Sequence, residues 1–459
     1  MQFPFVNAPS ADSLATLFLT SEQLPKWREN QSERVRRWLD TARFAGKAGT
    51  HCIIPGEDGR PAQLLVGRAS DDWLWAMAHL PNSLGPVICE LTDPPAPHDA
   101  ALAALGFGLG AYRFTRYGAK AIEPAKLVIP ANVDATQLHA ELRAISLTRD
   151  LINTAAADMM PEHLSATVSA LADEFGGSFA EIVGDDLLAQ DYPAVHAVGR
   201  ASAHAPRLLD LRWQSPNAKR SVTLVGKGVC FDSGGLDLKP ASGMRLMKKD
   251  MGGAATALGL ASRIMANELP VRLRVLIPAV ENAVSGNAFR PGDVLSTRAG
   301  LTVEIDNTDA EGRLILCDAL HEAGSERPDA IIDFATLTGA ARIAVGTELP
   351  ALFSNNDDLA EGLLSGGLEV SDPVWRLPLH QPYRQMLNSN IADMVNSASV
   401  PHGGAITAAL FLERFVPAGV NWAHFDIMAW NTRNRPGRPE GGEAMAMRAV
   451  YQHLNAWSE

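Results

Sequence analysis

The sequence is organised around one stretch, Asn307-Thr308-Asp309-Ala310-Glu311-Gly312-Arg313-Leu314. An apolar, strand-like run over residues 301–305 precedes it, and a helical pattern of apolar residues continues from it to residue 320. Two carboxylates and a guanidinium therefore stand where a strand passes into a helix, which in an α/β sheet is the edge that binds ligands. The alternative is an ordinary charged helix N-terminus, because acidic residues there are stabilised by the helix dipole.

Length and composition favour a two-domain protein. A chain of 459 residues exceeds what one hydrophobic core usually supports. We therefore predict an N-terminal α/β domain over residues 1–135 and a catalytic domain over residues 136–459. The formal net charge of −12 argues against nucleic acid as the main partner, since binding phosphates requires a basic face.

The sequence predicts a cytoplasmic protein without a membrane partner. Residues 1–5 lack the basic segment and apolar core of a secretory signal, and no apolar run reaches the roughly 18 residues of a membrane span. The four cysteines, Cys52, Cys89, Cys230 and Cys317, show no paired spacing, so neither a disulfide framework nor a thiolate zinc site is expected. This cysteine usage fits a reducing compartment.

The remainder of the chain predicts an α/β fold. Beyond about residue 205, strand-like runs alternate with helical ones: strands over 221–225, 273–277, 330–334 and 420–427, and a helix over 250–265. This alternation indicates a central, mostly parallel sheet flanked by helices.

The first third of the chain reads as a smaller α/β domain. Its expected strands cover residues 52–54, 64–66, 87–89 and 126–130, and its helix covers residues 100–117, loosened by Gly106, Gly108 and Gly110. A glycine-rich nucleotide loop over residues 98–111 is disfavoured, because the strand–turn–helix context of that motif is missing.

Carboxylates after the predicted strands suggest a metal site. Asp232, Asp250, Asp309 and Glu311 carry four negative charges, which two divalent cations would balance. Hard oxygen ligands suit Mg²⁺, Mn²⁺ or Zn²⁺. A phosphate loop over residues 226–235 is the weaker interpretation, because the spacing of its glycines and lysine differs from that motif.

Three cations accompany these carboxylates. Lys227, Lys239 and Arg313 all lie within or next to the same segments. A buried lysine beside two metal ions could act as a neutral ligand, because nearby positive charge disfavours the ammonium form. A charged lysine and arginine could instead stabilise an oxyanion. Taken singly, each lysine could also be an ordinary surface charge, but their clustering favours a site.

With these residues in place, the sequence resembles the leucyl aminopeptidase (cytosol aminopeptidase) family of dinuclear metallopeptidases. The stretch 307–314 matches the family signature without a substitution, and a second signature block matches over 225–235, 239–240 and 248–251. Further similar segments are Arg149-Asp150-Leu151-Ile152-Asn153-Thr154, Ala335-Thr336-Leu337-Thr338-Gly339-Ala340 and Gly403-Gly404-Ala405-Ile406-Thr407-Ala408-Ala409. The resemblance is strong from about residue 140 to residue 430 and weaker before it.

The resemblance implies a set of metal ligands. Asp232, Asp309 and Glu311 would hold one readily exchanged metal ion. Lys227, Asp232, Asp250 and Glu311 would hold the other, so that Asp232 and Glu311 bridge the two. The ions would be Mn²⁺ or Zn²⁺, with Mg²⁺ as a further candidate.

The resemblance also implies roles for the remaining site residues. Lys239 would stabilise the tetrahedral gem-diolate, and Arg313 would hold a bicarbonate ion that acts as general base. Met247, Thr336 and Gly339 would line the pocket for the first side chain of the substrate. The substrates would be peptides with a free N-terminus, and the assembly would be a homohexamer of two stacked trimers.

An apolar pocket of this kind predicts good cleavage of leucine and methionine substrates, poor cleavage of acidic ones and a penalty for large aromatic residues. Met428 stands where the family commonly has a small residue, so a shallower pocket is expected. Two other functions are less favoured. A secondary DNA-binding role is disfavoured by the charge of −12, and a catalytically silent structural homologue is disfavoured because all of the motif residues are present.

Overall fold

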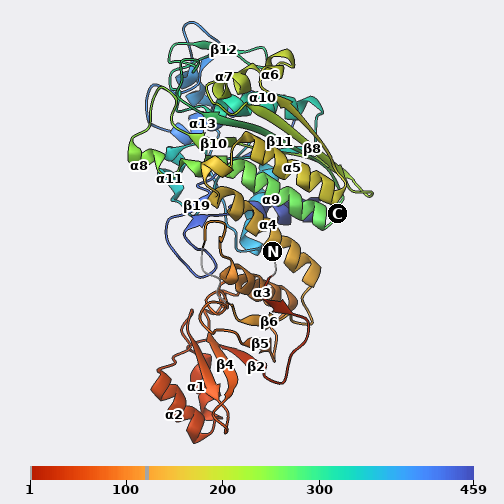
Figure 1. The fold of residues 1–459 in the computed structure, drawn as a ribbon, viewed down its shortest axis with the longest axis vertical. Coiled ribbons are helices and arrows are strands. Elements are labelled where there is room, and N and C mark those ends of the chain that lie inside the picture. The colour runs from red at the N-terminus through yellow and green to blue at the C-terminus, as the bar shows by residue number, and fades with distance from the viewer. Residues whose placement is uncertain (1–2, 119–122, 459) are drawn as a thin grey trace. The chain divides into compact units, whose positions relative to one another are not determined.

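The computed structural model describes residues 3–118 and 123–458, and it divides the chain into two compact units (Figure 1). Unit 1 comprises Met1–Arg143 and Arg433–Glu440, and unit 2 comprises Ala144–Thr432 and Gly441–Glu459. The division between residues 143 and 144 lies inside helix α4 (Ala135–Asn153), which begins where the sequence predicts the domain junction. Within the described residues, no helix combines the length and the apolar character that crossing a membrane requires.

Unit 1 contains a mixed six-stranded sheet in the order β1-β6-β5-β2-β4-β3. The strands are β1 (Phe5–Val6), β2 (Leu14–Leu19), β3 (His51–Pro55), β4 (Pro61–Gly67), β5 (Ile88–Leu91) and β6 (Lys126–Val128). Neighbouring strands are parallel except β3 and β4, which are antiparallel. Helices α1 (Gln23–Glu29) and α2 (Glu33–Ala42) bury Leu24 and Leu39 in a small core with Leu19 and Leu65.

Helix α3 (Pro97–Ala111) is shorter than the sequence predicts. The expected helix over residues 100–117 is wrong beyond residue 111, because Tyr112 takes an extended backbone with ψ 133°. The glycines inside the helix permit close packing rather than loosening it. A Cβ on Gly106 would lie 1.6 Å from the carbonyl oxygen of Leu74, and one on Gly110 would lie 2.0 Å from that of Ala78.

Unit 2 contains a nine-stranded sheet in the order β16-β15-β18-β14-β9-β11-β8-β7, with β10 paired to β11. The strands are β7 (Ser178–Val183), β8 (Arg207–Gln214), β9 (Arg220–Gly226), β10 (Gly228–Asp232), β11 (Val271–Asn282), β14 (Ala330–Ala335), β15 (Ala351–Ser354), β16 (Trp375–Arg376) and β18 (Trp422–Asp426). Strands β18, β14, β9, β11 and β10 pair in parallel. The predicted mostly parallel sheet is therefore confirmed.

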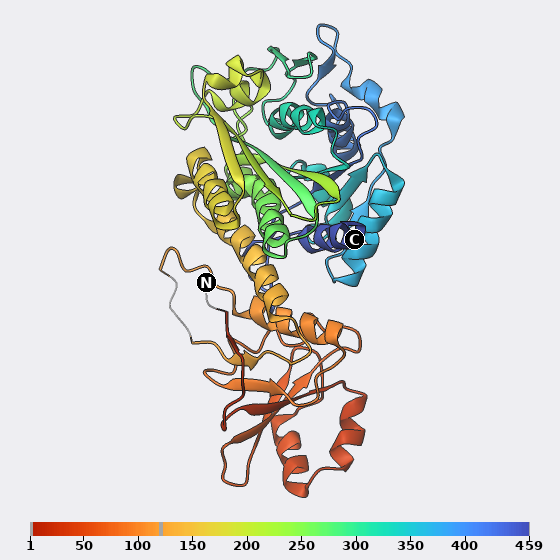
Figure 2. The same ribbon diagram turned by 90° about the vertical axis from the view of Figure 1, so that its right-hand side faces the viewer.

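Helices cover both faces of this sheet (Figure 2). The helices that lie wholly within unit 2 are α5 (Pro161–Phe175), α6 (Asp186–Ala189), α7 (Pro193–Gly199), α8 (Ala241–Met244), α9 (Gly252–Ala266), α10 (Gly312–Ser325), α11 (Gly339–Val345), α12 (Asp357–Glu369), α13 (Gly404–Glu413) and α14 (Met447–Ser458). Helices α5 and α9 lie on one face, and α7 and α10 lie on the other. Every residue of α9 from Gly252 to Met265 is buried, as expected for a mostly apolar helix packed inside the domain, and the buried set includes Thr256, Ser262 and Arg263.

Shorter elements complete unit 2. Three turns of 3₁₀-helix are η1 (Ala156–Asp158), η2 (Met247–Met251) and η3 (Gln381–Leu387). A three-stranded sheet joins β12 (Val294–Ser296), β13 (Thr302–Glu304) and β17 (Met394–Val395), and a two-stranded sheet joins β19 (Trp430–Asn431) and β20 (Gly441–Gly442). Strand β13 leads into the motif stretch at residue 307, so the predicted strand–loop–helix order around it is confirmed.

Candidate metal centre and active site

The predicted metal ligands converge at the carboxyl ends of neighbouring strands. Lys227 directly follows β9, and Asp232 is the last residue of β10. Asp250 lies in η2, while Asp309 and Glu311 lie in the loop that leads into α10. Lys227 and Asp232 thus stand at the carboxyl ends of strands of the large sheet, and the turn with Asp250 and the loop with Asp309 and Glu311 bring their charges to the same place from 23 to 84 residues further along the chain than Lys227.

Lys227 is the centre of the deeper half of the cluster. Its ammonium lies 2.8 Å from Asp250 Oδ2 and 3.0 Å from Glu311 Oε1, and it donates a hydrogen bond of 3.1 Å to the carbonyl oxygen of Thr336. The side chain is 3% exposed. Gly312 makes this packing possible, because a Cβ there would lie 2.5 Å from Lys227 Cε.

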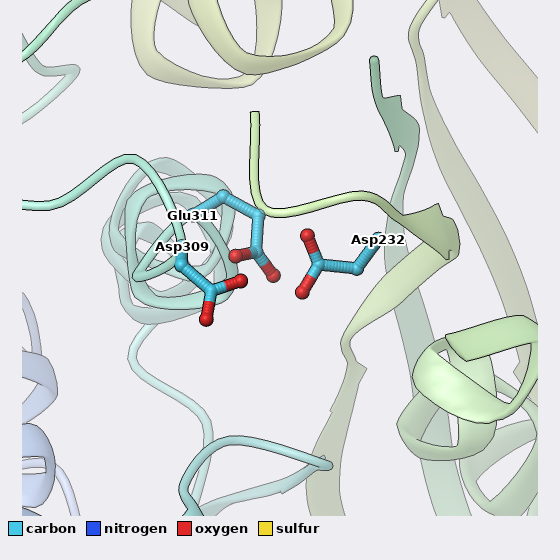
Figure 3. A group of neighbouring side chains, drawn as sticks. All are labelled: Asp232, Asp309 and Glu311. Carbon is cyan, nitrogen blue, oxygen red and sulfur yellow. The ribbon is translucent and has the colours of Figure 1, made fainter. Parts of the chain in front are cut away.

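Lys239 occupies the outer half of the cluster. Its ammonium lies 2.8 Å from Asp232 Oδ2 and also contacts Asp309 Oδ1. Asp309 is the more accessible acid, with a side chain 33% exposed. Each of Asp232, Asp309 and Glu311 can place one oxygen within 4.8 Å of the others, and Figure 3 shows the three carboxylates facing a common point.

Burial and the charges of neighbouring groups shift the pKa values of these acids. Burial, and then the charge of Asp232, raises the pKa of Glu311 to about 8. Burial, and then Asp250, raises the pKa of Asp232 to about 6. Burial would also raise the pKa of Asp250, but Lys227 and Lys249 outweigh burial and lower it. The four carboxyl groups thus outnumber the two lysines that pair with them, Lys227 and Lys239, and the crowding disfavours the ionised forms of Glu311 and Asp232.

The donor set fits hard divalent cations. Neither oxygen of Glu311 accepts a well-aligned hydrogen bond from any described residue, although both are buried. Asp250 Oδ2 is buried as well, and it and Glu311 Oε1 have the ammonium of Lys227 as their ion-pair partner, at 2.8 and 3.0 Å. A buried carboxylate oxygen without a well-aligned donor calls for an explanation, and a bound cation is one that fits this donor set. The carboxylates of Asp232, Asp309 and Glu311, which lie around one point, are oxygen ligands of the kind that Mg²⁺, Mn²⁺ and Zn²⁺ accept.

Arg313 lies in the first turn of α10, next to the cluster. Its Nη1 donates a hydrogen bond of 2.7 Å to the main-chain oxygen of Asn396. Its Nε is buried and has no hydrogen-bond partner among the described residues. Burial lowers the pKa of Arg313 to about 10, which still leaves a guanidinium at neutral pH. The side chain therefore keeps a free donor for an anion.

The residues expected to line the substrate pocket lie beside the cluster. Met247 is buried in η2, three residues before Asp250. Thr336 follows β14, and its hydroxyl donates a hydrogen bond of 2.8 Å to Asp250 Oδ1. Gly339 is the first residue of α11. Met428 is buried and its sulfur lies 3.6 Å from Nη1 of Arg342 in α11.

Sequence reasoning missed two asparagines that hold the loop over residues 306–311, here called the metal loop. Asn282 donates hydrogen bonds to Asp232 Oδ1 at 2.9 Å and to the Thr308 carbonyl at 3.1 Å. The side chain of Asn396 accepts from the Asp306 amide at 2.8 Å and donates to the Asn307 carbonyl at 2.7 Å. Both asparagines are buried and stand at or just after strand ends, and that position was the only available sequence signal.

Asp426 was also missed. It is the last residue of β18, and its carboxylate accepts hydrogen bonds from the amides of Leu337 at 3.0 Å and Thr338 at 3.2 Å. It also accepts a hydrogen bond of 2.6 Å from the Thr338 hydroxyl. Asp426 thus holds the loop between β14 and α11, which carries Thr336 and Gly339.

Comparisons with known proteins agree with this geometry. Residues 146–451 match the model of the cytosol aminopeptidase family, catalytic domain, and residues 16–130 match the M17 aminopeptidase, N-terminal domain. A probable cytosol aminopeptidase from a Geobacter species is 38% identical over 448 residues, covering 91% of each chain. One from Chlamydia abortus is 45% identical over 316 residues, covering 68% of this chain and 63% of that protein.

Two solved structures are similar over nearly their whole length. The crystal structure of cytosol aminopeptidase from Coxiella burnetii has a TM-score of 0.96 and 49% identity, covering 99% of each chain. The bottromycin maturation enzyme BotP in complex with Mn has a TM-score of 0.88 and 35% identity, covering 98% of this chain and 100% of that one.

Proposed function

This chain belongs to the cytosol aminopeptidase family of metallo-exopeptidases, and we propose that it removes the first residue of peptides through a pair of divalent cations. The observation that carries the proposal is the convergence of Asp232, Asp309 and Glu311, whose ligand atoms lie within 4.8 Å of one another, with both oxygens of the buried Glu311 lacking a hydrogen-bond donor among the described residues. We assign one ion to Asp232, Asp309 and Glu311, and the other to Lys227, Asp232, Asp250 and Glu311.

The cations would lower the pKa of a bound water and polarise the peptide carbonyl. The chain itself contributes a fixed frame. Asn282 orients the carboxylate of Asp232, and Thr336 orients that of Asp250. Partners of this kind hold ligands in place and tune a metal site.

Lys239 is proposed to stabilise the oxyanion that forms from the peptide carbonyl. Its ammonium lies at the outer side of the cluster, beside the more accessible acid Asp309. A preorganised cation acts most strongly where charge develops during the reaction. Arg313 is proposed to hold bicarbonate through its buried Nε, with the bicarbonate accepting a proton as general base.

The substrate pocket is proposed to take leucine- or methionine-sized first side chains. Met247, Thr336 and Gly339 border it, and methionine adapts its shape to several apolar partners. Gly339 has no side chain to fill the space at the start of α11. Each methylene in such a pocket changes the free energy by only about 1–3 kcal/mol, so the preferences should be graded.

Further parts of the proposal rest on the family. The ions are proposed to be Mn²⁺ or Zn²⁺, with Mg²⁺ as a third candidate; the similar bottromycin enzyme was solved with Mn. We propose an N-terminal domain over residues 1–135, a catalytic domain over residues 136–459, a cytoplasmic location and a homohexamer. Light scattering tests the assembly, and an active monodisperse monomer would contradict it.

Metal removal tests the proposed function. Dialysis against a chelator should abolish hydrolysis of leucine p-nitroanilide, and Mn²⁺ or Zn²⁺ should restore it. Metal content measured alongside should show two ions per chain in the restored protein. Circular dichroism of the dialysed protein serves as the control for folding. Hydrolysis that persists after complete metal removal would refute the proposal.

A further inference from the structure

Arg342 stands at the border of the proposed substrate pocket without any role in the chemistry described above. It lies on α11, three residues after Gly339, so both residues occupy the same side of the helix. A Cβ on Gly339 would lie 3.5 Å from Arg342 Nη2. The other terminal nitrogen, Nη1, lies 3.6 Å from the sulfur of Met428.

Contacts of Gly252 connect this arginine to the pocket. A Cβ on Gly252 would lie 2.4 Å from Ala429 Cβ and 3.3 Å from Thr336 Cγ2. The segment that carries Met428 therefore adjoins Thr336, and Arg342 packs on that segment. The guanidinium thus lies next to Gly339 and Met428, and the segment with Met428 lies next to Thr336. These residues border the space proposed for the first side chain of the substrate.

The charge of Arg342 is not balanced by a neighbouring acid. No carboxylate of the residues described forms an ion pair with it, and its one hydrogen-bond partner there is the sulfur of Met428. A thioether is a weak acceptor, whereas a guanidinium offers five N–H donors. Arg274 of unit 2 shows the paired alternative, since it forms ion pairs with both Asp210 and Glu322.

We propose that Arg342 is a specificity residue that binds an acidic first side chain of the substrate. This inference rests on the proposed aminopeptidase function and deepens it. A carboxylate matches the planar fork of the guanidinium, and the charge-assisted hydrogen bonds are stronger than neutral ones. The expectation of poor cleavage of acidic substrates is thereby revised: glutamate should be accepted alongside leucine and methionine, and it should be favoured over glutamine.

The competing explanation is a surface cation that stabilises the C-terminal end of α11, where positive charge is favoured by the helix dipole. The two explanations differ in one measurable quantity, the ratio of kcat/KM for a glutamyl substrate to that for the matching glutaminyl substrate. The two side chains have nearly the same shape, so the ratio reports charge recognition at the pocket.

The experiment compares glutamyl, glutaminyl and leucyl p-nitroanilides with the full-length, Mn²⁺-loaded protein. The Glu-to-Gln ratio should exceed one and should fall about 10- to 100-fold in Arg342→Gln, as expected for losing a hydrogen bond to a charged group. Leucine cleavage by each variant is measured as the reference for folding and metal loading, and Arg342→Lys should restore part of the Glu-to-Gln ratio. Arg272→Gln, which removes an exposed arginine of β11, controls for the change in net charge.

A Glu-to-Gln ratio that is the same in Arg342→Gln as in the unsubstituted protein would overturn the inference. So would an unsubstituted protein that cleaves glutamyl no better than glutaminyl substrates. That second measurement needs no variant, so it decides even if Arg342→Gln does not fold. Failure of the proposed function looks different, because the Mn²⁺-loaded protein would then cleave no leucyl substrate either.

Discussion

Replacing Lys227 with methionine removes the positive charge from the deepest part of the acid cluster. All of the polar contacts of its ammonium are internal: Asp250 Oδ2 at 2.8 Å, Glu311 Oε1 at 3.0 Å and the carbonyl oxygen of Thr336 at 3.1 Å. Methionine has a similar length, so Lys227→Met should leave no large cavity. Its effect on stability should therefore be mainly electrostatic.

The size of that effect follows from burial. Lys227, Asp250 and Glu311 are all 4% exposed or less at their side chains. Removing one partner of a buried ion pair leaves the other charge uncompensated and costs about 3–5 kcal/mol. We expect the metal-free protein to lose about this much of its free energy of unfolding at neutral pH.

The pH dependence has a definite sign. Burial would lower the pKa of Lys227, but Asp250, Glu311 and Asp232 outweigh burial and raise it. A raised lysine pKa stabilises the fold fully below the unfolded value of about 10.4, and the contribution is lost only as the pH rises through the still higher folded value. The lysine itself therefore stays charged between about pH 7 and pH 9, whereas Glu311, with its pKa of about 8, ionises in this range. The difference between the two proteins should grow as the pH rises through about 8, because only the ionised Glu311 is attracted by Lys227.

Urea denaturation of the metal-free proteins, followed by tryptophan fluorescence, measures the free energy. Calorimetric titration with Mn²⁺ then measures the sites, and Lys227→Met should lose one of the two because a proposed ligand is missing. Lys248→Met is the matched control: Lys248 is a nearby lysine whose ammonium contacts the carbonyl oxygen of Asn153 instead of an acid. Unchanged stability together with two intact Mn²⁺ sites would refute the reasoning.

Three further predictions concern catalysis, specificity and pH. Lys239→Ala should lower kcat by about 10²–10³ with little effect on KM, because its charge acts in the transition state; steady-state kinetics in which only KM changes would show that Lys239 binds substrate instead. Met428→Ala should raise kcat/KM for phenylalanyl relative to leucyl p-nitroanilide, and an unmoved ratio would mean that Met428 does not border the pocket. Asp333→Ala should remove the buried partner of His424, whose Nδ1 lies 2.6 Å from Asp333 Oδ1. Burial would lower the pKa of His424, but Asp333 outweighs burial and raises it. The pair therefore stabilises the folded protein fully at pH values below the pKa of unfolded histidine, about 6.5. This contribution is lost as the pH rises through the higher pKa of the folded state. Urea denaturation should show a loss of about 3–5 kcal/mol at about pH 6 and a smaller one at high pH, and an equal loss at both would contradict the assignment.

The sequence alone determined the fold class and the identity of the candidate ligands. Strand-like runs alternating with helical ones predicted the parallel sheet, because hydrophobic periodicity is a local property of the chain. The carboxylates of Asp309 and Glu311 stand at a strand–helix junction, a position that often binds ligands in α/β proteins, although only the structure shows that this strand, β13, belongs to the three-stranded sheet. Their convergence with Asp232 and Asp250 could be anticipated without coordinates from the family resemblance.

The tertiary structure decided what holds these residues in place. Asn396 reaches the metal loop from 86–90 residues away, and Asp426 reaches the Leu337 amide from 89 residues away. Arg342 meets Met428 across 86 residues. Such contacts depend on the register between strands β13 and β17 and between β14 and β18. Both pairs are parallel, so no hairpin turn joins the two strands to fix their register, and the burial of one face against the rest of the fold decides it.

The helix over residues 97–111 gives a second example of a feature that local sequence does not explain. From the sequence alone, its glycines predict a less stable helix, since glycine has a low helix propensity. In the structure Gly106 and Gly110 let the carbonyl oxygens of Leu74 and Ala78 approach the helix, and this need for space arises only when a second segment packs there. The low helix propensity of glycine is a local property that the sequence shows. The close approach that glycine permits depends on the neighbouring segment, so only the folded structure shows it.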